Sequence, residues 1–261
     1  MSYAQDASWQ DDPRLVPFYE QAERRADVVA FHAMVTALAP PTPGASVLEL
    51  GCGVGASSVA LGRAVGELGT VIGVDPSPGL VAAAERAAEG PVRFQVGSVD
   101  DLTFPDDEFD LVRLWARRPL ADPDAAVAEV VRLCRPGGRV VVVDADDASI
   151  TVDVADHALV TTTLGEARRA RRERTGYELR GRLVRAGCED AVASPYVYSM
   201  TALQDLAGFA PEFNRDLPSA VTQAPDGVAE MWFEALERAD RAGELLVSIT
   251  AWAAAARKPH R

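Results

Sequence analysis

The sequence has few cysteines and no long apolar run, and both shortages narrow what this protein can be. Its three cysteines, Cys52, Cys134 and Cys188, are far apart in the chain. That spacing offers neither a zinc pattern nor a disulfide framework. No stretch approaches the roughly 18 apolar residues that a membrane-spanning helix needs, and the N-terminus has no secretory signal pattern. We therefore expect a cytoplasmic protein with no metal site and no membrane contact.

Basic residues are also in short supply. The chain has 26 Lys and Arg against 39 Asp and Glu, for a net charge of −13. A strongly acidic chain is poorly suited to a phosphate backbone, so nucleic acid is not the expected partner. With 261 residues, 48% of them apolar, the chain can bury a sizeable core. We expect a small-molecule substrate and a monomer or homodimer.

The most informative stretch lies in the first third of the chain. The apolar residues Val47, Leu48 and Leu50 predict a buried strand. Glycines follow at once at positions 51, 53 and 55, and a second apolar strand ends at Asp75. In an open parallel sheet, ligands bind outside the carboxyl ends of the strands. A carboxylate placed there can accept hydrogen bonds from both hydroxyls of a ribose. The stretch therefore predicts a site for a nucleoside-containing cofactor.

The glycine spacing and one acidic residue narrow the choice of nucleoside. A dinucleotide site needs Gly-x-Gly-x-x-Gly, whereas here the glycine after Gly55 is Gly62, well inside the following helix. Glu49 stands two residues before Gly51, where its carboxylate would repel a pyrophosphate and attract an ammonium or sulfonium group. These features favour a cationic nucleoside without phosphates over a nicotinamide dinucleotide.

Strands alternate with helices along the first 150 residues, which predicts a doubly wound α/β fold. Helices are expected over residues 20–39, 56–65, 79–88, 123–133, 153–174, 177–186 and 228–242. Strands are expected over residues 46–50, 71–74, 92–96, 110–115, 139–144, 191–200 and 245–252. A turn is expected at Arg135–Gly138. The last helix and strand suggest a closing hairpin on the same, mostly parallel, seven-stranded sheet, with a helical cap over the site.

We expect a single domain, residues 1–261. Its parts are an N-terminal arm and helix (1–43), a cofactor-binding core (44–150), substrate-covering helices with an insertion (151–243) and a closing strand (244–261). In the third part, eight arginines and two glutamates lie between Arg168 and Arg185, a local charge of 8 − 2 = +6. The cluster is interpreted as a solvated helix face or as a surface for an anionic substrate or partner.

Four segments in order resemble one family. They are Val47-Leu-Glu-Leu-Gly-Cys-Gly-Val-Gly55, Val74-Asp-Pro-Ser77, Phe104-Pro-Asp-Asp-Glu-Phe-Asp110 and Leu133-Cys-Arg-Pro-Gly-Gly-Arg-Val140. Together they resemble the motifs of class I S-adenosylmethionine-dependent methyltransferases, most closely the small-molecule enzymes of the ubiquinone/menaquinone-biosynthesis type. The resemblance covers roughly residues 44–145 and implies a Rossmann-like fold and S-adenosyl-L-methionine as cofactor.

The resemblance also implies roles for individual residues. Glu49 would act on the methionine amino group of the cofactor, Asp75 would hold the ribose hydroxyls, and Trp115 would line the pocket. The full set of cofactor-binding residues expected is Glu49, Gly51, Cys52, Gly53, Gly55, Asp75, Pro76, Ser98, Val99 and Trp115.

Two positions depart from the family pattern. Where the family has Gly-Asp-Ala after the third strand, this chain has Gly97-Ser98-Val99, so the adenine contact is weakened or moves to Asp100 or Asp101. A histidine that the family often has after the fourth strand is replaced by Pro119.

Any general base must therefore be another residue of the chain. A base is needed only when the nucleophile must lose a proton. His157 and Asp146, in or after the loop that follows the fifth strand, are the catalytic candidates, whereas His32 is expected to be structural.

The leading hypothesis for function is methyl transfer from S-adenosylmethionine to O, N or C of a small molecule in secondary metabolism. The alternative keeps the cofactor but catalyses a cyclisation or rearrangement without methyl transfer. A third hypothesis is a binding protein that uses the cofactor only as a ligand.

Overall fold

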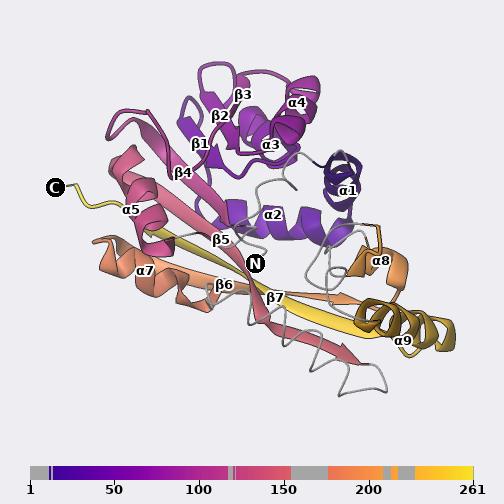
Figure 1. Cartoon of the computed structure of the whole chain (residues 1–261). Coiled ribbons are helices and arrows are strands. Elements are labelled where there is room, and N and C mark those ends of the chain that lie inside the picture. Colours follow the sequence, from indigo (N-terminus) through magenta and orange to yellow (C-terminus); the bar gives the residue numbers. More distant parts are fainter. Residues whose placement is uncertain are drawn as a thin grey trace. The chain divides into compact units, whose positions relative to one another are not determined.

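The computed structural model describes residues 12, 14–116, 120, 122–153, 176–207, 213–216 and 227–260. Helices and strands alternate along them (Figure 1). In chain order the elements are α1 (Leu15–Ala22), α2 (Ala26–Leu38), β1 (Ser46–Leu50), α3 (Ala56–Val65), β2 (Thr70–Asp75), α4 (Pro78–Ala87), β3 (Val92–Val96), β4 (Phe109–Ala116), α5 (Pro123–Leu133), β5 (Cys134–Asp153), η3 (Gly176–Glu178), α7 (Leu179–Arg185), β6 (Glu189–Met200), α8 (Leu203–Ala207), α9 (Val228–Ala242) and β7 (Leu246–Arg257).

The strands form one seven-stranded sheet in the order β3-β2-β1-β4-β5-β7-β6. Strands β1 to β5 pair in parallel, with Glu49 opposite both Gly73 of β2 and Arg113 of β4. Because the strand order reverses between β1 and β4, the loops that leave these two strands diverge and open a crevice at their carboxyl ends. This is the predicted α/β architecture with a mostly parallel sheet, and β6 and β7 are neighbours, as the expected closing hairpin requires.

The two faces of the parallel strands are covered by different helices. Leu48 and Leu50 point to one face and join a buried cluster with Val127 and Val130 of α5. Alternation places Glu49 on the opposite face, where it bonds to α3. In Figure 1, α3 and α4 lie on one side of β1 to β3, and α5 lies on the other side of β4. The central strands β1, β2 and β4 are mostly buried on both faces, which explains their largely apolar sequences.

The chain divides into two compact units. Among the described residues, the core unit comprises 12, 14–116, 120, 122–145, 176–196 and 252–260, and the second unit comprises 146–153, 197–207, 213–216 and 227–251. The predicted single domain and its helical cap stay predictions. None of the described helices is both long and apolar enough to cross a bilayer.

The second unit contains α8, α9 and the parts of β5, β6 and β7 at residues 146–153, 197–200 and 246–251. Trp232 and Leu236 of α9 are fully buried, and the Trp232 ring lies 5.8 Å from that of Phe213. The backbone N–H of Leu203 donates to Asp240 at 2.9 Å, which fixes the start of α8 against α9.

Several predicted elements are confirmed, some with identical bounds. Helices α3, α5 and α9 and strand β3 begin and end where the pattern placed them. Gly243, expected to end α9, has φ +71° and its N–H donates to Asp240 O, a left-handed helix terminus that glycine favours.

Other predictions are wrong. The single helix expected over 20–39 is two helices, because α1 ends at Ala22 and α2 begins at Ala26. Pro17 lies in the first turn of α1, where its missing N–H has no helical partner to lose. The turn expected at Arg135–Gly138 falls within the bounds of β5. At these residues the pairing of β5 with β4 shifts in register, between Phe109 and Leu111 of β4. Strand β5 also runs well beyond the predicted residues 139–144.

The helix expected over 153–174 lies outside the described residues after Asp153, which ends β5, and so do the arginines up to Arg174. The three described arginines of the cluster are engaged. Arg182 and Arg185 pair with Asp124 of α5, and Arg180 donates to Ala191 O at 3.0 Å. Arg182 is buried rather than solvated, and the role of the cluster stays a prediction.

We expect Gly62→Ala to destabilise the protein by roughly 1–2 kcal/mol. Alanine favours a helix over glycine by about 1 kcal/mol, but a Cβ at Gly62 would lie 2.3 Å from Cγ2 of Val92 in β3, and such overpacking costs about 1–3 kcal/mol. Urea denaturation measures the change.

The matched control is Gly181→Ala in α7, where the nearest atom to an added Cβ is Arg185 Nη1 at 3.4 Å. There we expect stabilisation of about 0.5–1 kcal/mol. In a Val92→Ala background Gly62→Ala should become neutral or stabilising. Equal effects at Gly62 and Gly181 would contradict the packing argument.

Candidate functional site

The loop between β1 and α3 is tied to the neighbouring strands by its backbone. The N–H groups of Gly51 and Cys52 both donate to Val74 O, at 2.7 and 3.1 Å. Gly51 has φ +73°, and a Cβ there would lie 2.5 Å from Trp115 O, so only glycine fits. At Gly53, also with positive φ, a Cβ would meet nothing within 4 Å. The loop therefore presents bare backbone to open space, where a ligand can approach closely.

Asp75 ends β2 and aims its carboxylate at this loop. Its Oδ2 accepts from Gly53 N and its Oδ1 from Ser77 N, both at 2.9 Å. The residue is 7% exposed. A carboxylate accepts about four hydrogen bonds, and these two alone do not exhaust that capacity. Ser77 in turn accepts from Leu80 N and caps α4, which holds the end of β2 in place.

Glu49 is completely buried on β1 and is the centre of a hydrogen-bond network. Its Oε1 accepts from Ser57 Oγ at 2.7 Å and from Trp115 Nε1 at 2.9 Å. Its Oε2 accepts from Ser58 Oγ at 2.5 Å. The carboxylate thus joins β1, the first turn of α3 and the end of β4, directly beneath the glycine loop.

A buried guanidinium accompanies this carboxylate. Arg113 of β4 lies opposite Glu49 in the sheet and is 0% exposed. Its three guanidinium nitrogens have no hydrogen-bond partner among the described residues. Burial lowers the pKa of Arg113, and the negative charge of Glu49 raises it again. Because an isolated buried charge is costly, the negative charge of Glu49 partly offsets the cost of burying the Arg113 guanidinium.

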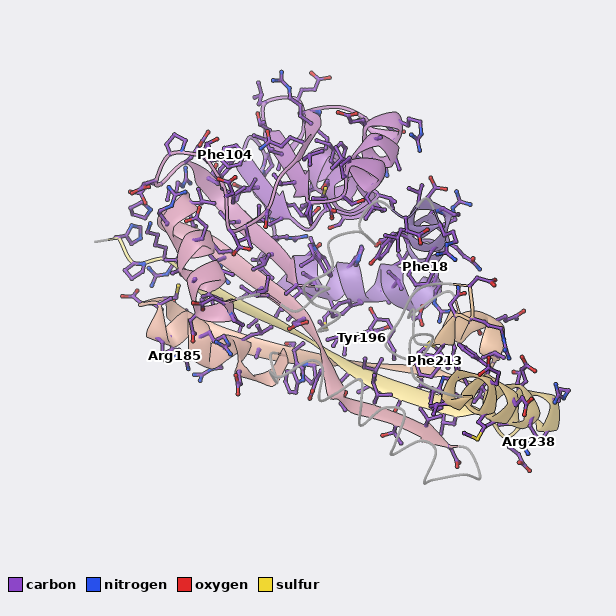
Figure 2. The ribbon with its side chains drawn as sticks, viewed as in Figure 1. Phe18, Phe104, Arg185, Tyr196, Phe213 and Arg238 are labelled. Carbon is purple, nitrogen blue, oxygen red and sulfur yellow. The ribbon has the colours of Figure 1, made fainter. Side chains whose placement is uncertain are left out.

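Aromatic rings gather at the carboxyl end of β4. The Trp115 ring lies 5.9 Å from Phe31 and 4.7 Å from His32, both on α2. Phe31 also packs against Tyr196, a residue of β6 that Figure 2 labels, with the two ring centroids 5.2 Å apart. Trp115 and Phe31 are buried, whereas His32 and Tyr196 are partly exposed. This cluster forms an apolar wall beside the glycine loop.

The loop after β3 has a different character. Ser98 Oγ accepts from Asp100 N at 3.4 Å, and Asp101 N donates to Ser98 O at 3.0 Å. Ser98 and Val99 are partly exposed, as is Pro76 after β2. Val99 and Asp100 also line a surface hollow with Phe104, Glu129 and Arg132. The adenine contacts expected here stay predictions.

The structure brings together much of the predicted cofactor set. Gly51, Cys52, Gly53 and Asp75 are joined by backbone or carboxylate bonds, and Trp115 touches Gly51 and bonds to Glu49. The carboxylate of Glu49 has 0% exposure and already accepts three hydrogen bonds, so its predicted action on an amino group stays a prediction.

The structure does not place the predicted catalytic residues in this site. His157 and Pro119 lie outside the described residues. Asp146 was expected in or after a loop, but it lies inside β5, where its carbonyl accepts from Ser149 Oγ at 2.6 Å.

Sequence reasoning missed Ser57, Ser58 and Arg113. The signals were available: two consecutive serines one turn after the glycine loop, and an arginine inside an otherwise apolar strand. Neither signal could be interpreted without knowing that Glu49 lies between them.

The fold and the glycine loop define a Rossmann-like α/β domain. Residues 47–138 match the family described as a methyltransferase domain. The predicted resemblance is confirmed.

Named relatives match stretches of the chain of similar length. The demethylmenaquinone methyltransferase of Symbiobacterium thermophilum is 36% identical over 109 residues, which are 40% of this chain and 43% of the relative. The nocamycin O-methyltransferase of Saccharothrix syringae is 39% identical over 108 residues, 40% of this chain and 39% of the relative. The chain thus spans less than half the length of these curated relatives.

Solved structures extend the likeness of fold to nearly the whole chain. Phosphoethanolamine N-methyltransferase 2 of Haemonchus contortus, solved in complex with S-adenosyl-L-methionine, matches with a TM-score of 0.60 over 95% of this chain and 57% of that chain. At 16% sequence identity this match shows the fold alone.

We expect Trp115→Phe to destabilise the protein by about 1.5–3 kcal/mol beyond the loss of ring packing, because it removes a hydrogen bond to a buried carboxylate. Urea denaturation measures the change. Trp252→Phe is the matched control, since the Nε1 of Trp252 has no partner among the described residues. If both variants lose the same stability, the bond to Glu49 contributes nothing.

The thiol of Cys52 in the glycine loop is expected to be unreactive, as are those of Cys134 and Cys188. All three are buried and free. Burial raises the pKa of Cys52 and Cys188, and raises that of Cys134 to about 12. Ellman's reagent at pH 8 should therefore titrate the native protein slowly and three thiols after unfolding.

These raised pKa values also make the free energy of unfolding depend on pH. Thiols in the unfolded chain ionise at about pH 8.5, which is below the raised pKa of the same thiols in the folded protein. The contribution of these buried thiols to the free energy of unfolding is thus complete below that pH and falls as pH rises above it. Rapid titration of Cys52 in the native protein would contradict its burial.

Proposed function

We propose that this protein is an S-adenosylmethionine-dependent methyltransferase that acts on O, N or C of a small molecule in secondary metabolism. The observation that carries the proposal is the bond from Gly53 N to the Asp75 carboxylate, because it joins an open glycine loop to an acid at the end of β2. A ribose held by that acid lies against bare backbone and over the buried Glu49. Such a surface suits a cationic nucleoside and repels a pyrophosphate.

The residues present fit this cofactor. Asp75 would accept from the two ribose hydroxyls, and the open space over Gly53 would admit the ribose and methionine parts. Glu49 would place negative charge beneath the positive end of the ligand, while Pro76, Ser98 and Val99 would border the adenine. When bound, S-adenosylmethionine supplies an electrophilic methyl group on a sulfonium sulfur.

The protein's own contribution is positioning and charge. Arg113 places a positive charge opposite the fully buried Glu49 in the sheet. Trp115 is held by Glu49 and, with Phe31, excludes water from one side of the glycine loop. An apolar wall beside a fixed carboxylate strengthens the electrostatic attraction for a cation, because the local dielectric constant is low.

The relatives support the same reaction. One relative is named a demethylmenaquinone methyltransferase and another a nocamycin O-methyltransferase, and a structural neighbour was solved with S-adenosyl-L-methionine. The remaining expectations join the proposal: a small-molecule substrate, no nucleic-acid partner, a cytoplasmic location, and a monomer or homodimer.

Incubation with S-adenosylmethionine and candidate substrates tests the reaction. Methyl transfer yields S-adenosylhomocysteine and a product with one added methyl group, both measured by mass spectrometry. Product formed without S-adenosylhomocysteine would replace transfer by a cyclisation or rearrangement. Binding without any reaction would favour the ligand-binding hypothesis, and binding of NAD instead would favour a dehydrogenase.

We expect Asp75→Asn to weaken binding of S-adenosylhomocysteine by roughly 10- to 100-fold, because charge-assisted hydrogen bonds contribute about 1.5–3 kcal/mol. Isothermal titration calorimetry measures the dissociation constant. Glu89→Gln, which removes a surface carboxylate paired with Arg63, is the control and should leave it unchanged. Unchanged affinity in Asp75→Asn would refute the ribose role.

A further inference from the structure

The helix α2 brings a histidine to the carboxyl end of β4. The imidazole of His32 lies with its ring centroid 4.7 Å from that of Trp115, the next-to-last residue of β4. Trp115 in turn bonds to Glu49 and touches Gly51. His32 is therefore separated from the glycine loop by one side chain, at the sheet edge where ligands of this fold bind.

A carboxylate faces one ring nitrogen of this histidine. Glu23 Oε2 lies 3.5 Å from His32 Nδ1, and the two side chains are 11% and 16% exposed. The tight connection between α1 and α2 places Glu23, since Glu23 N donates to Tyr19 O and Arg25 N to Ala22 O. A carboxylate on one ring nitrogen favours the proton there, which leaves the other nitrogen as the acceptor.

We propose that His32, oriented by Glu23, is the general base that deprotonates a phenolic or enolic hydroxyl of the substrate during methyl transfer. The inference rests on the proposed function and narrows its substrate class. An unperturbed histidine has a pKa of about 6.5, which suits the deprotonation of weakly acidic hydroxyls better than that of aliphatic alcohols. A hydroxyl oxygen is also the kind of nucleophile that needs a base.

The step balances in atoms and charge. His32 Nε2 takes the proton as the O–H bond breaks. The substrate oxygen bonds to the methyl carbon, and the sulfonium sulfur keeps the electron pair of the broken carbon–sulfur bond and becomes a neutral thioether. The imidazolium, stabilised by the negative charge of Glu23, then gives its proton to water.

The groups around the imidazole support this role. Glu23 from the α1–α2 connection lies within ion-pair distance of the ring, with its Oε2 3.5 Å from Nδ1. Trp115 of β4 carries no titratable group, and it lies between the ring and Glu49, to which it is bonded. Phe31 packs between Trp115 and Tyr196 of β6. The negative charge of Glu23 therefore acts directly on the imidazole.

The first test needs neither cofactor nor substrate. The full chain has three histidines, His32, His157 and His260, so nitrogen-15 histidine NMR resolves each, with His32→Gln assigning the first. We expect neutral His32 as the Nδ1–H tautomer. Glu23→Met should abolish that preference and lower the pKa of His32, and Glu23→Gln, which keeps an acceptor, should restore the tautomer.

The second test measures turnover. Wild type is incubated with S-adenosylmethionine and catechol, 1-naphthol or 4-hydroxycoumarin, and release of S-adenosylhomocysteine is followed. We expect His32→Gln to lower kcat by about 100- to 1,000-fold with KM changed little. Its pH profile should lose the plateau set by the pKa of His32. The matched variant His260→Gln, at an exposed position, should behave as wild type.

Calorimetry with S-adenosylhomocysteine separates the two levels of failure. If wild type does not bind it, the proposed function fails and this inference fails with it. If wild type binds it but methylates none of the three hydroxyl probes, or if His32→Gln keeps its kcat, only the role of His32 is overturned. A dominant Nε2–H tautomer in wild type would overturn it as well.

Discussion

The buried carboxylate of Glu49 is the interaction on which the site depends. It lies on a central strand with no access to water, and it is stable there because Ser57, Ser58 and Trp115 donate to it and Arg113 opposes its charge. The donors come from the first turn of α3 and from the end of β4, so these bonds also fix where α3 starts and where β4 ends. Removing the charge would leave three donors and a buried guanidinium without a partner.

The geometry of the glycine loop follows from that arrangement. Trp115 is held by Glu49, and its backbone carbonyl leaves room only for glycine at position 51. Gly53 then presents open backbone, and Asp75 reaches it from β2. The apolar wall of Phe31 and Trp115 lies on the same side, with His32 at its rim. A carboxylate that would be costly alone thus organises the loop, the acid and the histidine.

Much of this could be predicted from local sequence. Alternation, apolar runs and glycines located the core strands and most helices, and the bounds of α3, α5 and α9 agree. Errors arose where tertiary contacts overrode local pattern. The first helix was expected to begin at residue 20, although α1 begins at Leu15 and holds Pro17 in its first turn, where a proline is tolerated. The Pro-Gly-Gly at 136–138 was taken as a turn although it lies within the bounds of β5, at a shift in its register with β4. Asp146 was placed in a loop because the length of β5 depends on its partners.

By itself, the sequence determined the α/β class, the glycine loop, the acid at the end of the second strand and hence the resemblance to methyltransferases. Those features are contiguous, and their spacing is set by the strand and helix periods. Only the tertiary structure decided which residues meet. Glu49 and Trp115 are 66 positions apart, and His32 reaches Trp115 from another element. Such contacts depend on the register of strands and the packing of helices, which no local pattern encodes.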